Sequence, residues 1–155
     1  MNSKLTTAYR FVVERLRRHP GLAMVDDWYV FEGEPQDTAP MGTTRTGVRL
    51  VPVPEPVEPV CTVGPGVVSY ATPLTIRYEA RVPGTNADDA LDLAAAIAAA
   101  LQPDSSPGSP DPQAFRDAGI SRVEWTNDGG KAGLNPSFNG TIRLVIFQDR
   151  VVLTY

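Results

Sequence analysis

The chain has 155 residues, which suits a single domain that can bury a core without disulfides or metal ions. Its formal net charge is −4, and this acidic balance argues against a general nucleic-acid-binding protein, which needs a basic surface. The 15 prolines are about twice the usual share of roughly 5%, so we expect long, stiff connections.

The charge is unevenly distributed along the chain. Residues 1–20 carry five basic side chains and one acidic side chain, whereas the remainder is strongly acidic. A positive end and a negative remainder would allow head-to-tail contacts between copies of the chain. The alternative is that Arg15, Arg17 and Arg18 lie in the last turn of a helix, where cations interact favourably with the helix dipole.

The first predicted element is an amphipathic helix that runs from Ser3, a favourable N-cap, to about His19. Its apolar residues recur at steps of four, three and four, which places them on one helix face. Pro20 follows directly and ends the helix. The apolar stripe consists of Leu5, Tyr9, Val12 and Leu16.

Two strands are predicted next, with a loop between them. Residues 26–32 are aromatic and β-prone, and residues 45–53 place apolar side chains on one face. Residues 33–44 contain two prolines and two glycines, so we expect an extended loop there.

A proline-rich arm is predicted at about residues 52–66. Proline cannot donate a hydrogen bond to a neighbouring strand, so this segment is not a central strand. It is either an edge strand or an arm with a polyproline-like backbone. The candidate arm contacts are Pro52, Pro54, Pro56, Val57 and Pro59.

Residues 67–82 form the clearest predicted strand, because apolar and polar residues alternate from residue 74 onwards. One face of this strand is therefore expected in the core, and the other face is expected to be polar. A second helix follows, with Thr85 or Asn86 as its N-cap, and runs to about Leu101. This helix is rich in alanine, so we expect it to lie close against a sheet or another helix.

A flexible, low-complexity loop is predicted at about residues 103–113. The remaining predictions are a helical turn at 115–118, a strand at 121–126, a turn-rich loop at 127–136, and strands at 139–148 and 151–155. The strands are mostly consecutive, which favours antiparallel pairing. The predicted fold class is α+β: one domain over residues 1–155, with a mainly antiparallel sheet, two helices packed on one face and long proline-rich loops.

No catalytic or metal-binding set is recognisable, so we expect a protein that is not an enzyme and needs no cofactor. A catalytic triad needs a base beside its nucleophile, and the single histidine, His19, is expected at the exposed end of the first helix. The single cysteine, Cys61, is expected to be a small apolar side chain. Zinc requires several Cys or His ligands, so we expect no metal site.

The polar face of the 67–82 strand is the most informative surface in the sequence. Arg77, Glu79 and Arg81 project together from it. Arg143 on the late strand and Arg49 on the second strand are candidates to join them. This set is either a solvated sheet face or a candidate subunit interface, where it would form salt bridges or line a ring.

Taken in order, these elements resemble the tail terminator (tail completion) proteins of long-tailed bacteriophages. The resemblance covers most of the chain. It rests on the helix with its charged end (YRFVVERLRRHPG), the aromatic strand (WYVFEG) and the proline-rich arm. It continues with the long strand that leads into the alanine-rich helix and with the late strand (GTIRLVIFQDR).

This resemblance implies a structural role and no catalytic residues. Such proteins form a hexameric ring that caps the tail tube, ends its polymerisation and joins the tail to the head. The implied partners are further copies of the chain, the tail tube protein, a head-side neck or connector protein, and DNA that passes without specific binding. We expect an acidic ring surface, a virion location after synthesis in the host cytoplasm, and no membrane partner.

Three alternatives remain open at the level of sequence. The first is another virion role, such as a head-closure, neck or minor tail protein. The second is a small cytoplasmic ligand-binding α+β domain, which would have a concave apolar pocket. The third is an enzyme that uses only carboxylates, which would have two acids in different environments within one cleft.

Overall fold

The computed structural model describes the backbone of residues 4–30, 41–54, 58–64, 67–147 and 151–152, and the side chains of residues 4–30, 41–53 and 73–146. Within these residues the chain forms three α-helices, one 3-10 helix and a seven-stranded sheet. The helices are α1 (Lys4–Arg18), η1 (Pro20–Leu22), α2 (Ala87–Leu101) and α3 (Asp111–Asp117). The strands are β1 (Asp27–Val30), β2 (Gly47–Pro54), β3 (Glu58–Gly64), β4 (Val67–Arg81), β5 (Ile120–Lys131), β6 (Ser137–Phe147) and β7 (Val151–Val152).

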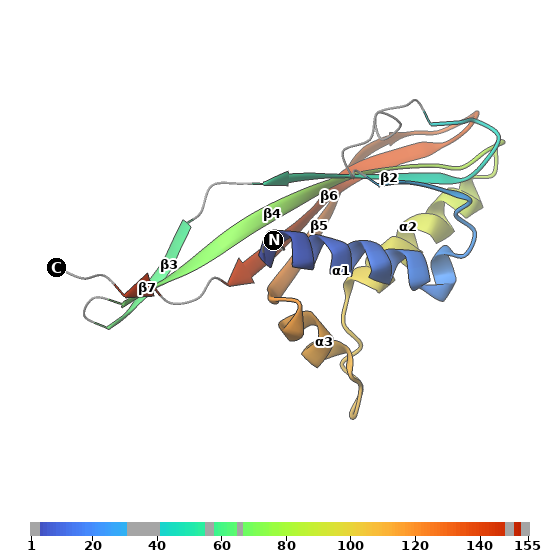
Figure 1. Ribbon diagram of the computed structural model, residues 1–155. Helices are drawn as coiled ribbons and strands as arrows, with labels where there is room; N and C mark the ends of the chain where they lie inside the picture. Colours follow the sequence, from blue (N-terminus) through green and yellow to red (C-terminus); the bar gives the residue numbers. More distant parts are fainter. Residues whose placement is uncertain (1–3, 31–40, 55–57, 65–66, 148–150, 153–155) are drawn as a thin grey trace.

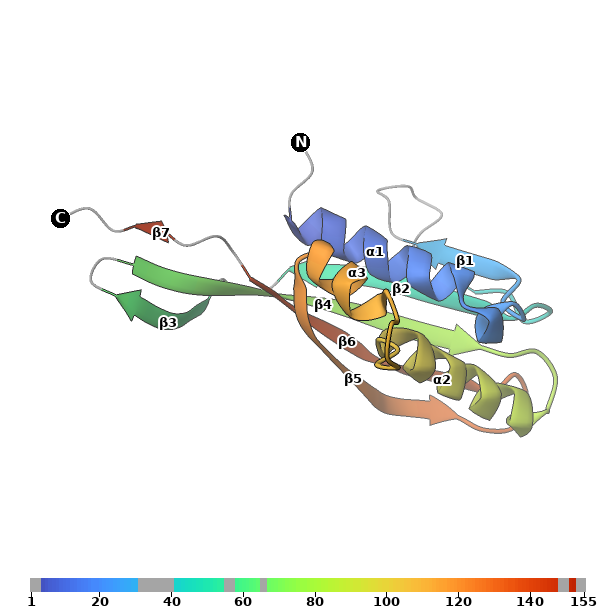
Figure 2. The same ribbon diagram turned by 90° about the horizontal axis from the view of Figure 1, so that it is seen from below.

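The helices lie on one face of the sheet, and the other face carries no helix (Figures 1 and 2). This arrangement confirms the predicted α+β class with a mainly antiparallel sheet. The predicted loop at 103–113 ends earlier than expected, because α3 begins at Asp111. Part of the predicted loop at 33–44 lies outside the described residues.

The sheet has the strand order β1-β2-β4-β6-β5, so its central pairs join strands that are not neighbours in the sequence. The expectation of antiparallel pairing is wrong for β1, which pairs with β2 in parallel from Asp27 to Val30. A parallel pair needs a connection of about a dozen residues or more, and residues 31–46 provide that length.

The core lies between the helices and the sheet. The predicted stripe of α1 faces it, with Val12 and Leu16 buried and Leu5 and Tyr9 packed at its margin. The apolar face of β4 is likewise buried, as its alternation predicts. The fully buried large side chains of the sheet are Val48, Leu50, Ile76, Ile142, Leu144 and Ile146.

Helix α2 has the boundaries that its sequence predicts. The Asn86 side chain accepts a hydrogen bond from the backbone N–H of Asp88 at 3.0 Å, which caps the first turn. Leu93 and Ile97 are buried, and the small alanines allow α2 to pack against α1 and η1.

Strand β5 is longer than predicted. Residues 127–131, which were expected in a loop, continue the pairing with β6 up to Lys131. A register shift between Asn127 and Gly129 lets the strand continue through this segment. Gly130 is needed there, because a Cβ atom would lie 2.5 Å from the carbonyl oxygen of Ser137. Gly130 therefore serves close strand packing rather than a turn.

The first half of β4 leaves the body of the molecule. Its residues 67–71 pair with β3, and residues 67–68 also pair with β7. Figures 1 and 2 show this ribbon projecting beyond the helices. We call β3 and the first part of β4, residues 58–64 and 67–72, the hairpin arm.

Candidate interaction surfaces

The sheet face without helices carries all five residues predicted as a candidate subunit interface. Glu79 on β4 lies directly opposite Arg49 on β2, in the register of that strand pair. Arg77 and Arg81 share this face with Glu79, because each is two residues away along β4. Arg143 on β6 joins them through its pairing opposite Thr75. The structure thus brings the five together on what we call the open face.

The open face is positively charged. Strand β5 extends it with Arg122, Glu124, Asp128 and Lys131, so that it holds six basic and three acidic side chains. Glu124 pairs with Arg122 at 3.0 Å and with Arg143 at 3.9 Å. Within the part of the chain that the structure describes, Arg77 and Glu79 form no ion pair. The expectation of an acidic ring surface, drawn from the charge of the whole chain, does not fit this face.

Two arginines of the open face have buried hydrogen-bond donors with no acceptor among the residues that the structure describes. The Arg49 guanidinium lies over the Tyr29 ring, 5.2 Å from its centroid, and its Nε and Nη2 atoms are buried with no acceptor among the described residues. Arg81 donates from Nη1 to the carbonyl oxygen of Met41 at 3.2 Å, while its buried Nε has no acceptor there. Buried donors without acceptors destabilise a protein, so these groups favour an anionic or carbonyl-bearing partner.

The candidate arm contacts fall into three places. Pro52 and Pro54 lie within β2, opposite Ile76 and Leu74 of β4. They tolerate this position because β1 pairs only as far as residue 50, so that this end of β2 is an edge. Pro59 lies in β3, within the hairpin arm. Pro56 and Val57 lie outside the described residues.

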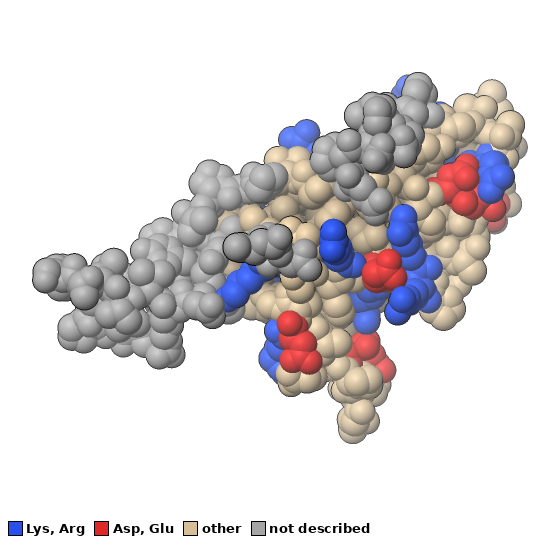
Figure 3. All heavy atoms as spheres, viewed as in Figure 1, with Lys and Arg blue, Asp and Glu red and all other residues tan. Residues whose placement is uncertain are grey.

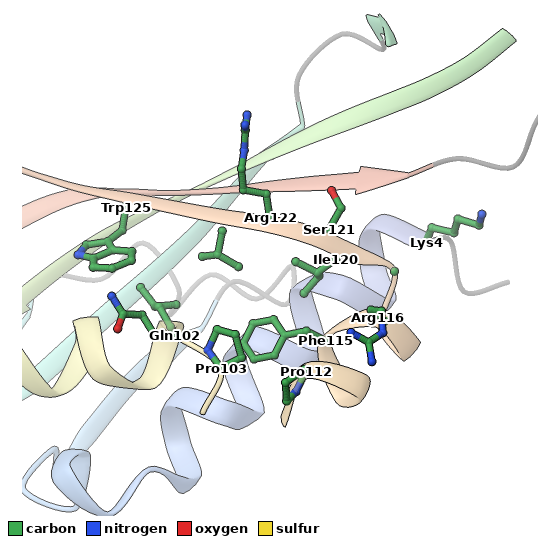
Figure 4. A pocket seen from close by; sticks show the side chains of 13 residues that line it. Lys4, Gln102, Pro103, Pro112, Phe115, Arg116, Ile120, Ser121, Arg122 and Trp125 are labelled. Atoms are coloured by element: carbon green, nitrogen blue, oxygen red, sulfur yellow. The ribbon is translucent and has the colours of Figure 1, made fainter. Parts of the chain in front are cut away.

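An apolar groove, which sequence reasoning missed, runs beside the edge strand β5 (Figure 4). It has a volume of about 670 Å³ and lies between β5, α3 and the end of α2. The three segments are distant in sequence, so the groove becomes visible only in the fold. Its one signal in the sequence was the aromatic residues of two short predicted segments, Phe115 in the helical turn and Trp125 in the strand. Its apolar lining includes Pro103, Pro112, Phe115, Ile120, Val123 and Trp125.

Arg15 organises the helical side of this groove. Its guanidinium donates to the backbone carbonyls of Ala100 and Gln102 at the end of α2, and to Asp111 Oδ2 at 2.8 Å. It also lies 4.9 Å from the centroid of the Phe115 ring. Arg15 therefore satisfies the C-terminus of α2 rather than that of its own helix.

The other two arginines in the last turn of α1 pair within the helix. Arg18 contacts Glu14 at 3.2 Å and Arg17 contacts it at 3.9 Å. Figure 3 shows basic side chains gathered around an acidic group over α1. Exposed pairs of this kind contribute little to stability. The sequence analysis offered helix-dipole interactions of last-turn cations as an alternative to head-to-tail contacts. The position required for it is confirmed, since Arg15, Arg17 and Arg18 all lie in the last turn of α1.

The Arg15–Asp111 ion pair makes the free energy of unfolding depend on pH in the acid range. Hydrogen bonds from the Arg15 guanidinium and from the backbone N–H of Asp104 lower the pKa of the Asp111 carboxyl group below its ordinary value. A lowered folded-state pKa stabilises the fold above the unfolded pKa of about 3.9, and this contribution is lost as pH falls through the folded-state value. We expect the melting temperature of the wild type to fall more steeply below about pH 4 than that of Asp111→Asn, as measured by circular dichroism. Parallel curves for the two proteins would contradict this assignment.

The described residues contain no recognisable catalytic or metal centre. His19 is half-buried rather than exposed, because its Nδ1 accepts the backbone N–H of Gly21 at 3.1 Å and so caps η1. Within the described ranges, no three His, Cys, Asp or Glu side chains gather closely enough to hold a metal ion. Among the same residues, no helix is both long and apolar enough to span a bilayer.

Comparison with known proteins gives no assignment. Neither a protein-family model nor a curated protein matches the chain.

Proposed function

We propose that this protein is a structural subunit of a bacteriophage virion. It assembles into a homo-oligomeric ring, a hexamer by resemblance to tail terminators, on the end of the tail tube. The ring ends tube polymerisation and provides the surface that the head-side neck or connector protein binds. The observation that carries this proposal is the hairpin arm, a long ribbon that extends beyond the helices and needs a partner outside its own body.

The open face supports the same role. It is a broad sheet surface without helices, and it presents Arg77 and Glu79 without ion-pair partners among the described residues. Self-complementary surfaces of this kind, with both signs of charge, suit contacts between identical subunits. The net charge of the open face is positive. Lining the channel of the ring, this face would attract the phosphates of passing DNA without recognising a base sequence.

The test is the mass of the purified protein in solution, measured by light scattering with and without tail tubes of the same phage. We expect either a ring of defined mass, or a monomer that becomes a ring only on tube ends, where electron microscopy would show a terminal cap. A protein that stays monomeric and leaves the tubes bare would overturn the proposal.

A second candidate, a small ligand-binding domain, is favoured by the groove beside β5. Its volume of about 670 Å³ and apolar lining are within the usual range for small-molecule sites, roughly 300–1,000 Å³. This candidate predicts a monomer whose melting temperature rises with an added apolar ligand. The light-scattering measurement distinguishes the two functions, because a ligand-binding domain is expected to be a monomer and a tail terminator is expected to form a ring.

A further inference from the structure

We propose that the groove beside β5 is the docking site for the hairpin arm of a second copy of this chain. The inference deepens the proposed function and rests on its claim of self-association. Two surfaces meet in this contact: the arm of one subunit, residues 58–64 and 67–72, and the groove of the next, between β5, α3 and the end of α2.

The arm cannot fold back into the groove of its own subunit. Strand β4 is continuous over 15 residues, and its second half is fixed between β2 and β6. The arm is the straight extension of that fixed strand and leads away from the helices (Figures 1 and 2). An arm that fills the groove must therefore come from another copy of the chain.

The groove offers apolar contacts and a free strand edge together. Phe115, Val123 and Trp125 line it, and β5, from which the last two project, pairs only with β6 among the described strands. The arm is itself a strand pair, and β3 pairs only with β4 among the described strands. Two such edges allow one sheet to extend into the next, while apolar side chains enter the groove.

The charges of the two surfaces are complementary. The charged residues at the groove are all basic: Lys4, Arg116 and Arg122, of which Arg122 projects from β5 away from the groove and onto the open face (Figure 4). The sequence from residue 51 to residue 73 contains two charged residues, Glu55 and Glu58, both acidic. Glu58, the one charged residue of the arm, and Glu55, which precedes the arm, thus match the basic residues at the groove.

This contact joins two different patches, so it is head-to-tail. Such contacts close into a ring when the rotation between neighbours permits and form open chains when it does not. Each subunit then donates one arm and accepts one, and every groove of a closed ring is filled. A filled groove also has no room for a small ligand, which distinguishes this proposal from the second candidate function.

Cross-linking tests the contact directly, because the single cysteine of the chain, Cys61, lies in β3 of the arm. We would introduce Gln102→Cys, an exposed position in the groove, and treat the assembled protein with a short bis-maleimide. The expected product is a ladder of covalent oligomers that ends at the ring size. The control, Asp92→Cys on the exposed side of α2, is expected to give no ladder. Equal ladders from both variants, or none from the groove variant, would overturn the proposal.

Charge reversal provides the second test. The variant Lys4→Glu with Arg116→Glu is expected to lower the oligomer fraction at least tenfold at low salt, and adding Glu55→Lys with Glu58→Lys is expected to restore it. The control, Arg10→Glu with Arg17→Glu, makes the same change in net charge outside the groove. A loss of oligomer in the groove variant that the combined variant does not reverse would contradict the pairing of the arm with the groove.

The two proposals fail in different ways. A ring of normal mass with no arm–groove cross-links, and with full tolerance of the charge reversal, would refute the docking site and leave the ring function standing. A monomer under all conditions, with and without tail tubes, would refute the ring and the docking site together.

Discussion

Gly140→Ala is expected to lower the free energy of unfolding by about 3 kcal/mol, which for a domain of this size lowers the melting temperature by roughly 6–12 °C. A Cβ atom at this position would clash with the backbone carbonyl oxygen of Thr126 and would lie 2.5 Å from the Tyr78 hydroxyl. The carbonyl belongs to the neighbouring strand β5, so relief requires the strand itself to move. Thermal and urea unfolding would measure the loss.

The cost is high because Tyr78 uses the space that the glycine leaves. Its ring crosses Gly140, and its hydroxyl donates to the Thr126 carbonyl at 2.7 Å. Burial, with a smaller effect of Asp128, raises the pKa of the Tyr78 phenol, so the hydroxyl stays protonated and donates throughout the neutral range. Tyr78→Phe in the Gly140→Ala background would remove only the hydroxyl contact. The ring carbon Cζ, 2.7 Å from the new Cβ, and the Thr126 carbonyl would remain, so we expect little stability to be recovered.

Gly129→Ala is the matched control. It lies in the same hairpin, and its new Cβ would meet the Asn139 side chain at 3.6 Å, an ordinary contact. We expect its unfolding free energy to stay within about 0.5 kcal/mol of the wild type. Similar losses at both glycines would mean that glycine flexibility, and not the crossing of Tyr78, determines the effect.

The parts of the fold that could be predicted from sequence are those with a strong local signal. The N-cap at Asn86, the alanines that follow and the proline at 103 fix α2 without help from the rest of the chain. The alternation in β4 likewise fixes which side chains face the core. Because a strand face is set by period alone, Arg77, Glu79 and Arg81 could be placed together in advance.

The errors arose where a local signal had two meanings. The glycines at 129 and 130 were interpreted as a turn, but they lie in β5, where close packing against β6 excludes a side chain at Gly130. Pro112 was interpreted as part of a loop, although proline in a first turn also begins a helix, as it does in α3. In each case the neighbouring strand or helix, and not the residue type, decided the outcome.

The interaction surfaces depend on pairings that no local pattern contains. The parallel β1–β2 pair joins segments whose partners are 20 residues apart, from Asp27 with Gly47 onwards. The groove beside β5 forms only when α3 packs next to the edge of the sheet. The arm was predicted as a proline-rich segment, but its partner strand β4 and its direction follow from the strand order. Sequence thus identified the residues of the open face, whereas the groove and the direction of the arm followed from the topology.

Arg15→Ala is expected to destabilise the protein by about 2–3 kcal/mol, the second large effect. The change removes charge-assisted hydrogen bonds to the carbonyls of Ala100 and Gln102 and leaves Asp111 without its cation. Those carbonyls lie at the end of α2, where the helix has no further N–H groups to offer them. Because Arg15 side-chain atoms are only 20% exposed, water replaces these bonds incompletely.

The effect should extend beyond stability to the groove. Asp111 begins α3 and Phe115 lies on it, so Arg15 connects α1 and α2 to one wall of the groove. Hydrogen exchange at the amides of α3 is expected to increase more in Arg15→Ala than the global loss of stability explains. Arg15→Lys keeps the charge without the planar fork and should give an intermediate result.

Arg17→Ala is the matched control on the same helix turn. Arg17 contacts only Glu14 among the described residues, at 3.9 Å, so its loss should change the unfolding free energy by less than about 0.5 kcal/mol and leave exchange in α3 unaltered. Equal effects of the two substitutions would mean that helix charge matters and the bridge to α2 and α3 does not. A selective effect of Arg15→Ala would instead identify the residue that holds the helical wall of the groove in place, because Arg15 alone of the three arginines in that turn contacts α2 and α3 among the described residues.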